Sequence, residues 1–215
     1  MSAFAWHGAM MLLAWLVLLP AGALVARFYK VLPRQDYPAV TDSRVWWRAH
    51  LLLQYGATAL ACIGLWTAWD ALGGTWDWSN AHALLGMGVM ALCATQVASG
   101  WLRGTKGGPT GTRADPADPA TWRGDHYDMT RRRLLFEGWH KPTGYVSLLL
   151  AVPVVCLGAE LIDAPWWVQA LPVLSAMVFS IAFIRLTRLG RHVDTWSAIW
   201  GPRVRSSPEI GSGQP

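Results

Sequence analysis

The sequence predicts an all-α integral membrane protein, a bundle of five transmembrane helices. Two features of composition predict this fold class: 53% of the 215 residues are hydrophobic while only 14% are charged, and 15 residues are tryptophan. This composition is typical of membrane proteins rather than of soluble domains. The third feature is the presence of five apolar stretches of sufficient length.

A transmembrane helix needs about 20 residues to cross a hydrocarbon core of about 30 Å. The five stretches cover approximately residues 5–26, 49–69, 81–102, 142–162 and 167–187. None contains Lys or Arg before its end. The fourth helix is expected to start earlier than its apolar stretch, with Thr130 as N-cap.

The positive charges predict the orientation. All 18 Lys and Arg residues lie after the first helix, after the third helix or in the C-terminal segment. The other two connections contain only acids, and these are Asp70, Asp77, Glu160 and Asp163. The positive-inside rule places the N-terminus outside and the C-terminus in the cytoplasm, and we expect a bacterial inner membrane. The net charge of +5 thus reflects topology, and no motif predicts nucleic-acid binding.

The segments outside the helices are rich in Gly and Pro. Residues 103–138 form the longest soluble segment and are expected to be irregular as far as Asp128. Residues 202–215 have the composition of a disordered tail. We therefore divide the chain into a transmembrane domain, residues 1–190 with the loop 103–138, and a cytoplasmic C-terminal tail, residues 191–215.

Four of the six histidines stand at or within the predicted helices: His7, His50, His82 and His140. An ionisable residue in a membrane span is costly and usually has a functional partner. His7 and His82 occupy the first turns of helices that both start outside. If the second and fourth helices begin near Ser43 and Thr130, His50 and His140 lie about 10–15 Å from those starts. The chain therefore supplies two histidine pairs, one toward each face.

Two imidazoles from facing helices are the axial ligands that a haem iron takes, and helical bundles provide slots for the flat macrocycle. The pattern predicts a four-helix core with two b haems, bound without covalent attachment because no C-x-x-C-H motif occurs. A zinc site would need three or four clustered ligands. The glycines near these histidines leave room for a porphyrin or, alternatively, serve helix packing; they are Gly8, Gly56, Gly86, Gly88 and Gly144. His126 and His192 are expected to be solvated surface residues.

Four segments resemble the cytochrome b561 family, in the form also found as the membrane half of DOMON-fused proteins. They are HGAMMLLAWLVLLPAGALVARFYK at 7–30, RAHLLLQYG at 48–56, NAHALLG at 80–86 and WHKPTGY at 139–145. The resemblance covers roughly residues 7–187. It implies two b haems, one held by His7 with His82 and the other by His50 with His140, which agrees with the depths of the histidines.

The resemblance also implies an activity. Family members move electrons across a membrane, often from ascorbate to monodehydroascorbate or ferric chelates, and basic residues at the cytoplasmic end of the first ligand helix help to bind the donor. Arg27 and Lys30 match that place. Members usually have six helices, one more than this sequence predicts, and a shorter loop than residues 103–138.

Three functions remain open at this point. The first is a transmembrane di-haem oxidoreductase for small substrates such as ascorbate or ferric complexes. The second is a haem-bearing membrane anchor of a larger dehydrogenase or redox complex, with a partner subunit or a second copy of the chain. The third is a transporter whose histidines bind a metal ion or relay protons. Iron with two histidine ligands has no open position, which favours an electron carrier over an oxygen-activating enzyme.

Overall fold

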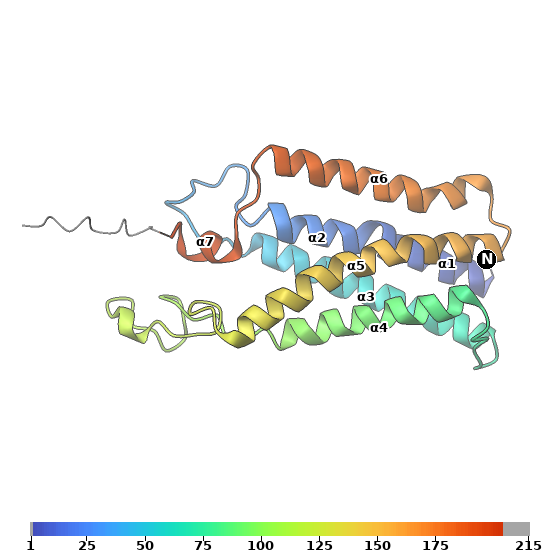
Figure 1. Cartoon of the computed structure of the whole chain (residues 1–215), viewed down its shortest axis with the longest axis horizontal. Helices are drawn as coiled ribbons and strands as arrows, with labels where there is room; N and C mark the ends of the chain where they lie inside the picture. Colours follow the sequence, from blue (N-terminus) through green and yellow to red (C-terminus); the bar gives the residue numbers. More distant parts are fainter. Residues whose placement is uncertain (1, 204–215) are drawn as a thin grey trace, which may run out of the picture.

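The structure is a computed structural model that describes residues 2–203. In that part of the chain it is all-helical, as the sequence predicts. Five helices are long and apolar enough to cross a membrane, and Figure 1 shows them lying side by side as an elongated bundle. The predicted disordered tail, residues 202–215, lies outside the described residues except for its first two.

The first span is composite. α1 (Ala3–Leu13) continues through a π-helical turn, η1 (Ala14–Leu18), into α2 (Leu19–Phe28). Pro20 has no N–H to offer the carbonyl of Leu16 four residues earlier. The Ser175 hydroxyl of α6 donates to that carbonyl at 2.6 Å. This bond ties α6 to the middle of the first span.

The other spans are continuous helices, and two of them are capped at the N-terminus by a side chain. They are α3 (Val45–Ala71), α4 (Ala81–Trp101), α5 (Arg131–Leu161) and α6 (Trp166–Arg188). The Asn80 side chain accepts hydrogen bonds from the backbone N–H groups of His82 and Ala83, which satisfies donors that the first turn leaves free. Thr130 accepts from the N–H of Arg133, which confirms it as the N-cap of α5.

Two helical hairpins form the centre of the bundle. In the first hairpin (residues 3–71) α1 and α2 pack along α3, and in the second hairpin (residues 81–161) α4 packs along α5. α6 lies against α5 and α2 at the edge of the bundle (Figure 1). Buried residues of both hairpins form one hydrophobic core, which includes Trp15 and the small residues Ala57, Ala61, Cys93 and Ala151.

The two ends of the bundle differ in charge. The acidic end carries the connections 72–80 and 162–165, and the basic end carries the connections 29–44 and 102–130 and the segment that follows α6. At the basic end, the long connection contains one short 3₁₀ helix, η2 (Pro119–Thr121), and is otherwise irregular. α7 (Thr195–Trp200), which the sequence pattern did not predict, lies at the same end (Figure 1).

Candidate functional site

The histidines nearest the acidic end come from different hairpins and face each other. The ring centres of His7 in α1 and His82 in α4 lie 6.1 Å apart, with their planes at 89°. Two imidazoles that bind one metal ion from opposite sides, with metal–nitrogen bonds of about 2 Å, have ring centres about 6 Å apart. The spacing of this pair therefore fits axial ligation of a single iron.

In the first hairpin, each histidine is held by a carbonyl of the opposite helix. His7 Nδ1 lies 2.8 Å from the carbonyl oxygen of Gly64, and His50 Nδ1 lies 3.0 Å from that of Gly22. A carbonyl oxygen only accepts hydrogen bonds, so Nδ1 carries the proton in both rings. The Nε2 lone pair is then available to a metal.

The second hairpin repeats the arrangement with one difference. His82 Nδ1 lies 2.9 Å from the carbonyl oxygen of Val154, whereas His140 Nδ1 lies 2.8 Å from the hydroxyl oxygen of Ser99. Metal-binding histidines usually donate their second ring N–H to such an acceptor, which fixes the ring and the tautomer. Among residues 2–203, all four histidines are fixed in this way, and their Nε2 atoms have no protein partner.

The five glycines near the histidines differ in how much space lies beside them. A Cβ atom added at Gly8, Gly56 or Gly88 would meet nothing within 4 Å. A Cβ at Gly86 would touch Val154, and one at Gly144 would lie 3.2 Å from the Gln96 amide oxygen. The first three positions thus border open space, and Gly88 is exposed, whereas the last two pack against a neighbouring helix.

Gly158 is a site residue that the sequence analysis missed. A Cβ atom at this position would lie 2.6 Å from His82 Cε1 and 3.0 Å from its Nδ1, closer than side-chain atoms can approach. The absence of a side chain on α5 is therefore required for the observed position of the His82 ring. The sequence carries no signal for this role, because the bond from His82 to the Val154 carbonyl, four residues before Gly158, is seen only in the structure.

At the basic end, each histidine ring lies next to an aromatic ring. An arginine lies over each of these two aromatic rings. The His50 ring lies 6.0 Å from the Trp47 ring, and the Arg103 guanidinium lies 4.0 Å above Trp47. On the other hairpin, Phe136 stacks on His140 at 4.8 Å, and Arg133 lies 4.8 Å above Phe136. Both contacts have cation–π geometry.

The two arginines differ in their ion pairs. Arg133 is paired with Glu137 at 2.9 Å. Arg103 is half-buried and has no carboxylate partner within residues 2–203. A b haem carries two propionate carboxylates, and arginine is the side chain best suited to pair with a carboxylate. The residues present therefore fit the group that the histidine pattern predicts.

Arg27 and Lys30 lie at the basic end, as predicted, but Lys30 is not at the surface. Only 6% of Lys30 is exposed, and its Nζ donates to the carbonyl of Val193 at 3.0 Å. Burial, together with the charges of Lys141 and Arg27, lowers the pKa of Lys30 to about 8. The segment between α6 and α7 therefore covers this part of the predicted donor site.

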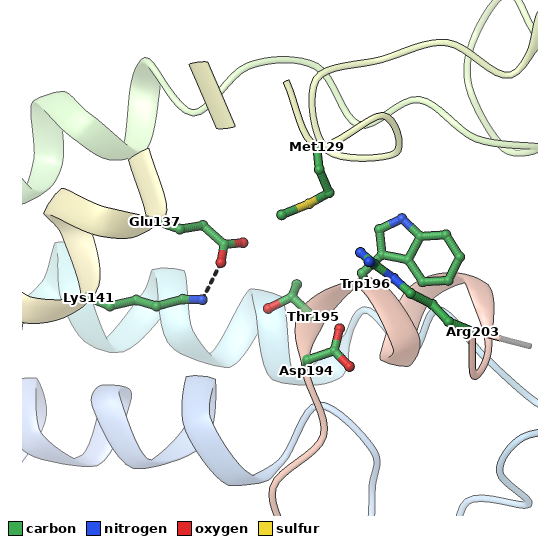
Figure 2. A pocket seen from close by; sticks show the side chains of 7 residues that line it. All are labelled: Met129, Glu137, Lys141, Asp194, Thr195, Trp196 and Arg203. Carbon is green, nitrogen blue, oxygen red and sulfur yellow. Dashed lines mark hydrogen bonds and ion pairs between the residues drawn. The ribbon is translucent and has the colours of Figure 1, made fainter. Parts of the chain in front are cut away.

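A cavity of about 350 Å³ opens at the basic end. Three of the charged residues that line it, Lys141, Glu137 and Asp194, also act on the charge of Lys30. Figure 2 shows that its walls come from the loop before α5, the first turns of α5, and α7. Glu137 and Lys141 form an ion pair on one wall. The lining residues are Met129, Glu137, Lys141, Asp194, Thr195, Trp196 and Arg203.

The prediction that His126 is a solvated surface residue is wrong. Only 6% of it is exposed, because its ring packs against Trp200 of α7 with ring centres 4.9 Å apart. Its backbone N–H donates to Thr105, and Trp196 Nε1 donates to the carbonyl of Tyr127. Burial and the nearby Arg133 lower the pKa of His126 to about 3. His192, by contrast, is exposed, as predicted.

Known proteins are similar to this chain over the same helices. The family model for eukaryotic cytochrome b561 matches residues 6–109, a range that contains His7, His50 and His82. The chain belongs to the cytochrome b561 family. Membership implies a b-type haem and a membrane environment with an electron donor and an electron acceptor. No solved structure matches the chain.

The relatives are much longer than this chain. It is 30% identical over 154 residues to a cytochrome b561, DM13 and DOMON domain-containing protein of Arabidopsis thaliana, which covers 72% of this chain and 14% of that protein. It is 28% identical over 155 residues to ferric-chelate reductase 1 of Homo sapiens, covering 72% and 22% of the two chains. It is 27% identical over 170 residues to ferric-chelate reductase 1 of Bos taurus, which covers 77% of this chain and 24% of that protein.

Proposed function

We propose that this chain transfers electrons across the membrane through two b haems, one near each end of the bundle. The observation that carries the proposal is the set of four histidines, each with Nδ1 bonded to an acceptor on the other helix of its own hairpin. His7 with His82, and His50 with His140, would hold the two irons. Each pair joins the first hairpin to the second.

A bound haem supplies a one-electron ferric/ferrous couple. The residues of the chain orient the four imidazoles and keep water away from them. Two histidines per iron leave no coordination position for oxygen or substrate, so the chain carries electrons and activates no substrate at the metal. With the basic end in the cytoplasm, as the positive-inside rule indicates, the path would run between the cytoplasm and the opposite face.

The donor site is proposed at the basic end, in the cavity lined by Lys141 and Arg203, where the buried Lys30 and the nearby Arg27 add positive charge. The cationic side chains there would hold an anionic reductant such as ascorbate close to His140, the residue that precedes Lys141. A ferric complex is the proposed acceptor at the acidic end, by analogy with the relatives named ferric-chelate reductase 1.

The haem content of the purified protein tests the proposal. We expect a pyridine haemochrome assay to find two b haems per chain after expression with ample haem. In vesicles loaded with ascorbate, the protein should reduce a membrane-impermeant ferric chelate outside. A haem-to-chain ratio well below one would favour the transporter reading and contradict the proposal.

The donor site has its own test in stopped-flow reduction. We expect Arg27→Gln with Lys30→Gln to slow reduction by ascorbate in a saturable, salt-sensitive way, and to leave reduction by a neutral reductant unchanged. Arg123→Gln, at a residue whose side chain is 77% exposed, is the matched control. If ascorbate reduces the wild-type protein slowly and without saturation, the donor site is wrong.

A second function is favoured by one observation: residues 103–130 and α7 pack together at the basic end, for example through the rings of His126 and Trp200, and form a cap there. A chain of this kind can serve as the haem-bearing membrane anchor of a redox complex. The cap at the basic end, made of residues 103–130 and α7, would be its docking surface. Slow, unsaturable reduction by ascorbate together with rapid reduction by a protein partner would favour this function.

A further inference from the structure

We propose that the Ser99 hydroxyl positions His140 and sets the reduction potential of the haem at the basic end. The inference rests on the proposed function, because it requires His140 to bind an iron. It starts from an asymmetry: three of the four histidines have a backbone carbonyl as the acceptor nearest Nδ1, whereas His140 has a side-chain hydroxyl at 2.8 Å.

The direction of the hydrogen bond follows from the second contact of Ser99. A hydroxyl has one proton, and the Ser99 hydroxyl donates it to the carbonyl of Gln96 at 2.9 Å. Ligation of an iron through Nε2 requires the proton of His140 to be on Nδ1, and the Ser99 oxygen, 2.8 Å away, then accepts its hydrogen bond. His140 thus has the same tautomer as the other three histidines, with the lone pair on Nε2.

The remaining contacts of His140 restrict its ring further. Phe136, one turn earlier on α5, covers one face of the ring with the planes 29° apart. The side-chain amide of Gln96, one turn before Ser99 on α4, lies between Thr143 and His140, with one amide atom 2.9 Å from the His140 carbonyl oxygen and 3.2 Å from His140 Nδ1. The Ser99 bond therefore sets the rotation of a ring whose face is already fixed.

An acceptor on Nδ1–H makes the imidazole more basic, and a more basic ligand favours ferric over ferrous iron. A serine hydroxyl is a weaker acceptor than a peptide carbonyl, although donation to Gln96 polarises it and strengthens it in part. Removing this acceptor should make His140 less basic. The potential of the basic-end haem should then rise, while the potential of the acidic-end haem should stay unchanged.

Redox titration of four variants tests the proposal. The series replaces Ser99 by Thr, which keeps the hydroxyl, by Cys, whose sulfur is a weak acceptor, and by Ala, which is favourable in a helix. The control is Thr95→Val, because Thr95 lies one turn away on α4 and donates to its own helix at Leu92 without touching a histidine. The low-spin electron paramagnetic resonance signals of the two ferric haems provide a second readout.

We expect Ser99→Ala to keep both haems and to raise one midpoint potential. The rise should be at most about 59 mV, which corresponds to a tenfold change in the ferric-to-ferrous ratio for a one-electron couple. Ser99→Cys should give a smaller rise, and Ser99→Thr and Thr95→Val none. The shifted component should be the one that His140→Ala removes. Its resonance signal should change in Ser99→Ala and return in Ser99→Thr.

The proposal is overturned if Ser99→Ala moves both potentials equally, lowers the potential, or moves it no more than Thr95→Val does. Loss of the haem in all three Ser99 variants would also overturn it, because the hydroxyl would then not be the property that matters. If the wild-type protein binds no haem, or if His140→Ala keeps both components, the failure lies with the proposed function instead.

Discussion

The two histidine pairs have the same plan but different surroundings. At the acidic end, His7 and His82 are held by the carbonyls of Gly64 and Val154, and one of the two rings lies against a glycine. At the basic end, one anchor is a hydroxyl, each ring has an aromatic neighbour, and arginines lie above those neighbours. The acidic-end site is thus built almost entirely from backbone, whereas the basic-end site keeps one backbone anchor, the Gly22 carbonyl, and adds side chains.

Because of this difference, the two ends should tolerate different substitutions. A site held by carbonyls changes only when the helices themselves move, so it should be sensitive to packing and insensitive to nearby polar substitutions. A site held by side chains can be adjusted residue by residue, with the helices in place. The predictions below use substitutions that should affect one end and leave the other unchanged.

The largest effect is expected at Gly158. In Gly158→Ala the new Cβ atom would overlap the His82 ring, so the ring must leave its position and the acidic-end haem should be lost. Gly138→Ala is the control, because Gly138 is on the same helix and has nothing within 4 Å. Alanine usually stabilises a helix relative to glycine by about 0.5–1 kcal/mol, so the control should not lose stability. Haem content and the visible spectrum measure both, and two intact haems in Gly158→Ala would refute the packing argument.

A smaller effect is expected at Arg103. Arg103→Gln removes the half-buried cation that has no carboxylate partner in the described part of the chain, and with it the contact to Trp47. We expect haem binding at the basic end to weaken roughly tenfold, as for other groups that support a metal ligand indirectly. Titration of the apoprotein with haem measures this, with Arg123→Gln as the exposed control. Equal weakening at both ends would show that Arg103 acts on the whole fold.

The smallest effect concerns the cap and its dependence on pH. The pKa of His126 is about 3 in the folded cap and about 6.5 in an unfolded chain. An unfolded cap therefore binds a proton first, so the stability that neutral His126 contributes is complete above pH 6.5 and is lost as the pH falls from 6.5 toward 3. The charged groups that act on the ring are Arg133, Glu137, Arg103 and Lys141.

Hydrogen exchange of the 103–130 segment measures that stability. We expect exchange to accelerate between pH 7 and pH 5, after correction for the intrinsic rate, while the spans stay protected. His126→Phe keeps the packing on Trp200 and should remove most of the acceleration. His192→Gln, at an exposed histidine, should not. An unchanged pH dependence in His126→Phe would show that other groups control the cap.

The spans and the four histidines could be predicted from the sequence because the bilayer restricts which residues a transmembrane helix can contain. A stretch without charge of about 20 residues has few alternatives to a transmembrane helix, and a histidine within it needs a partner. The cap of α5 at Thr130 was also predictable from its residue type. α5 itself starts well before the apolar stretch 142–162, because its first turns carry the charged residues of the basic end.

Other parts of the site left no signal in the sequence. Gly64 and Val154 hold histidines through carbonyl oxygens, which every residue has, so their side chains do not reveal the role. The burial of His126 depends on Trp200, which is far away in the chain and belongs to a six-residue helix without a transmembrane pattern. Such contacts follow from the packing of the helices and not from local composition.

The central claim is that each iron is held by one histidine from each hairpin. Spectra of the single and double histidine variants test it most directly. We predict that His7→Ala and His82→Ala remove the same component, and that the double variant removes no more than either alone. His50→Ala and His140→Ala should remove the other component, and His7→Ala with His50→Ala should remove both. If His7→Ala and His50→Ala delete the same component, the pairing across the hairpins is wrong.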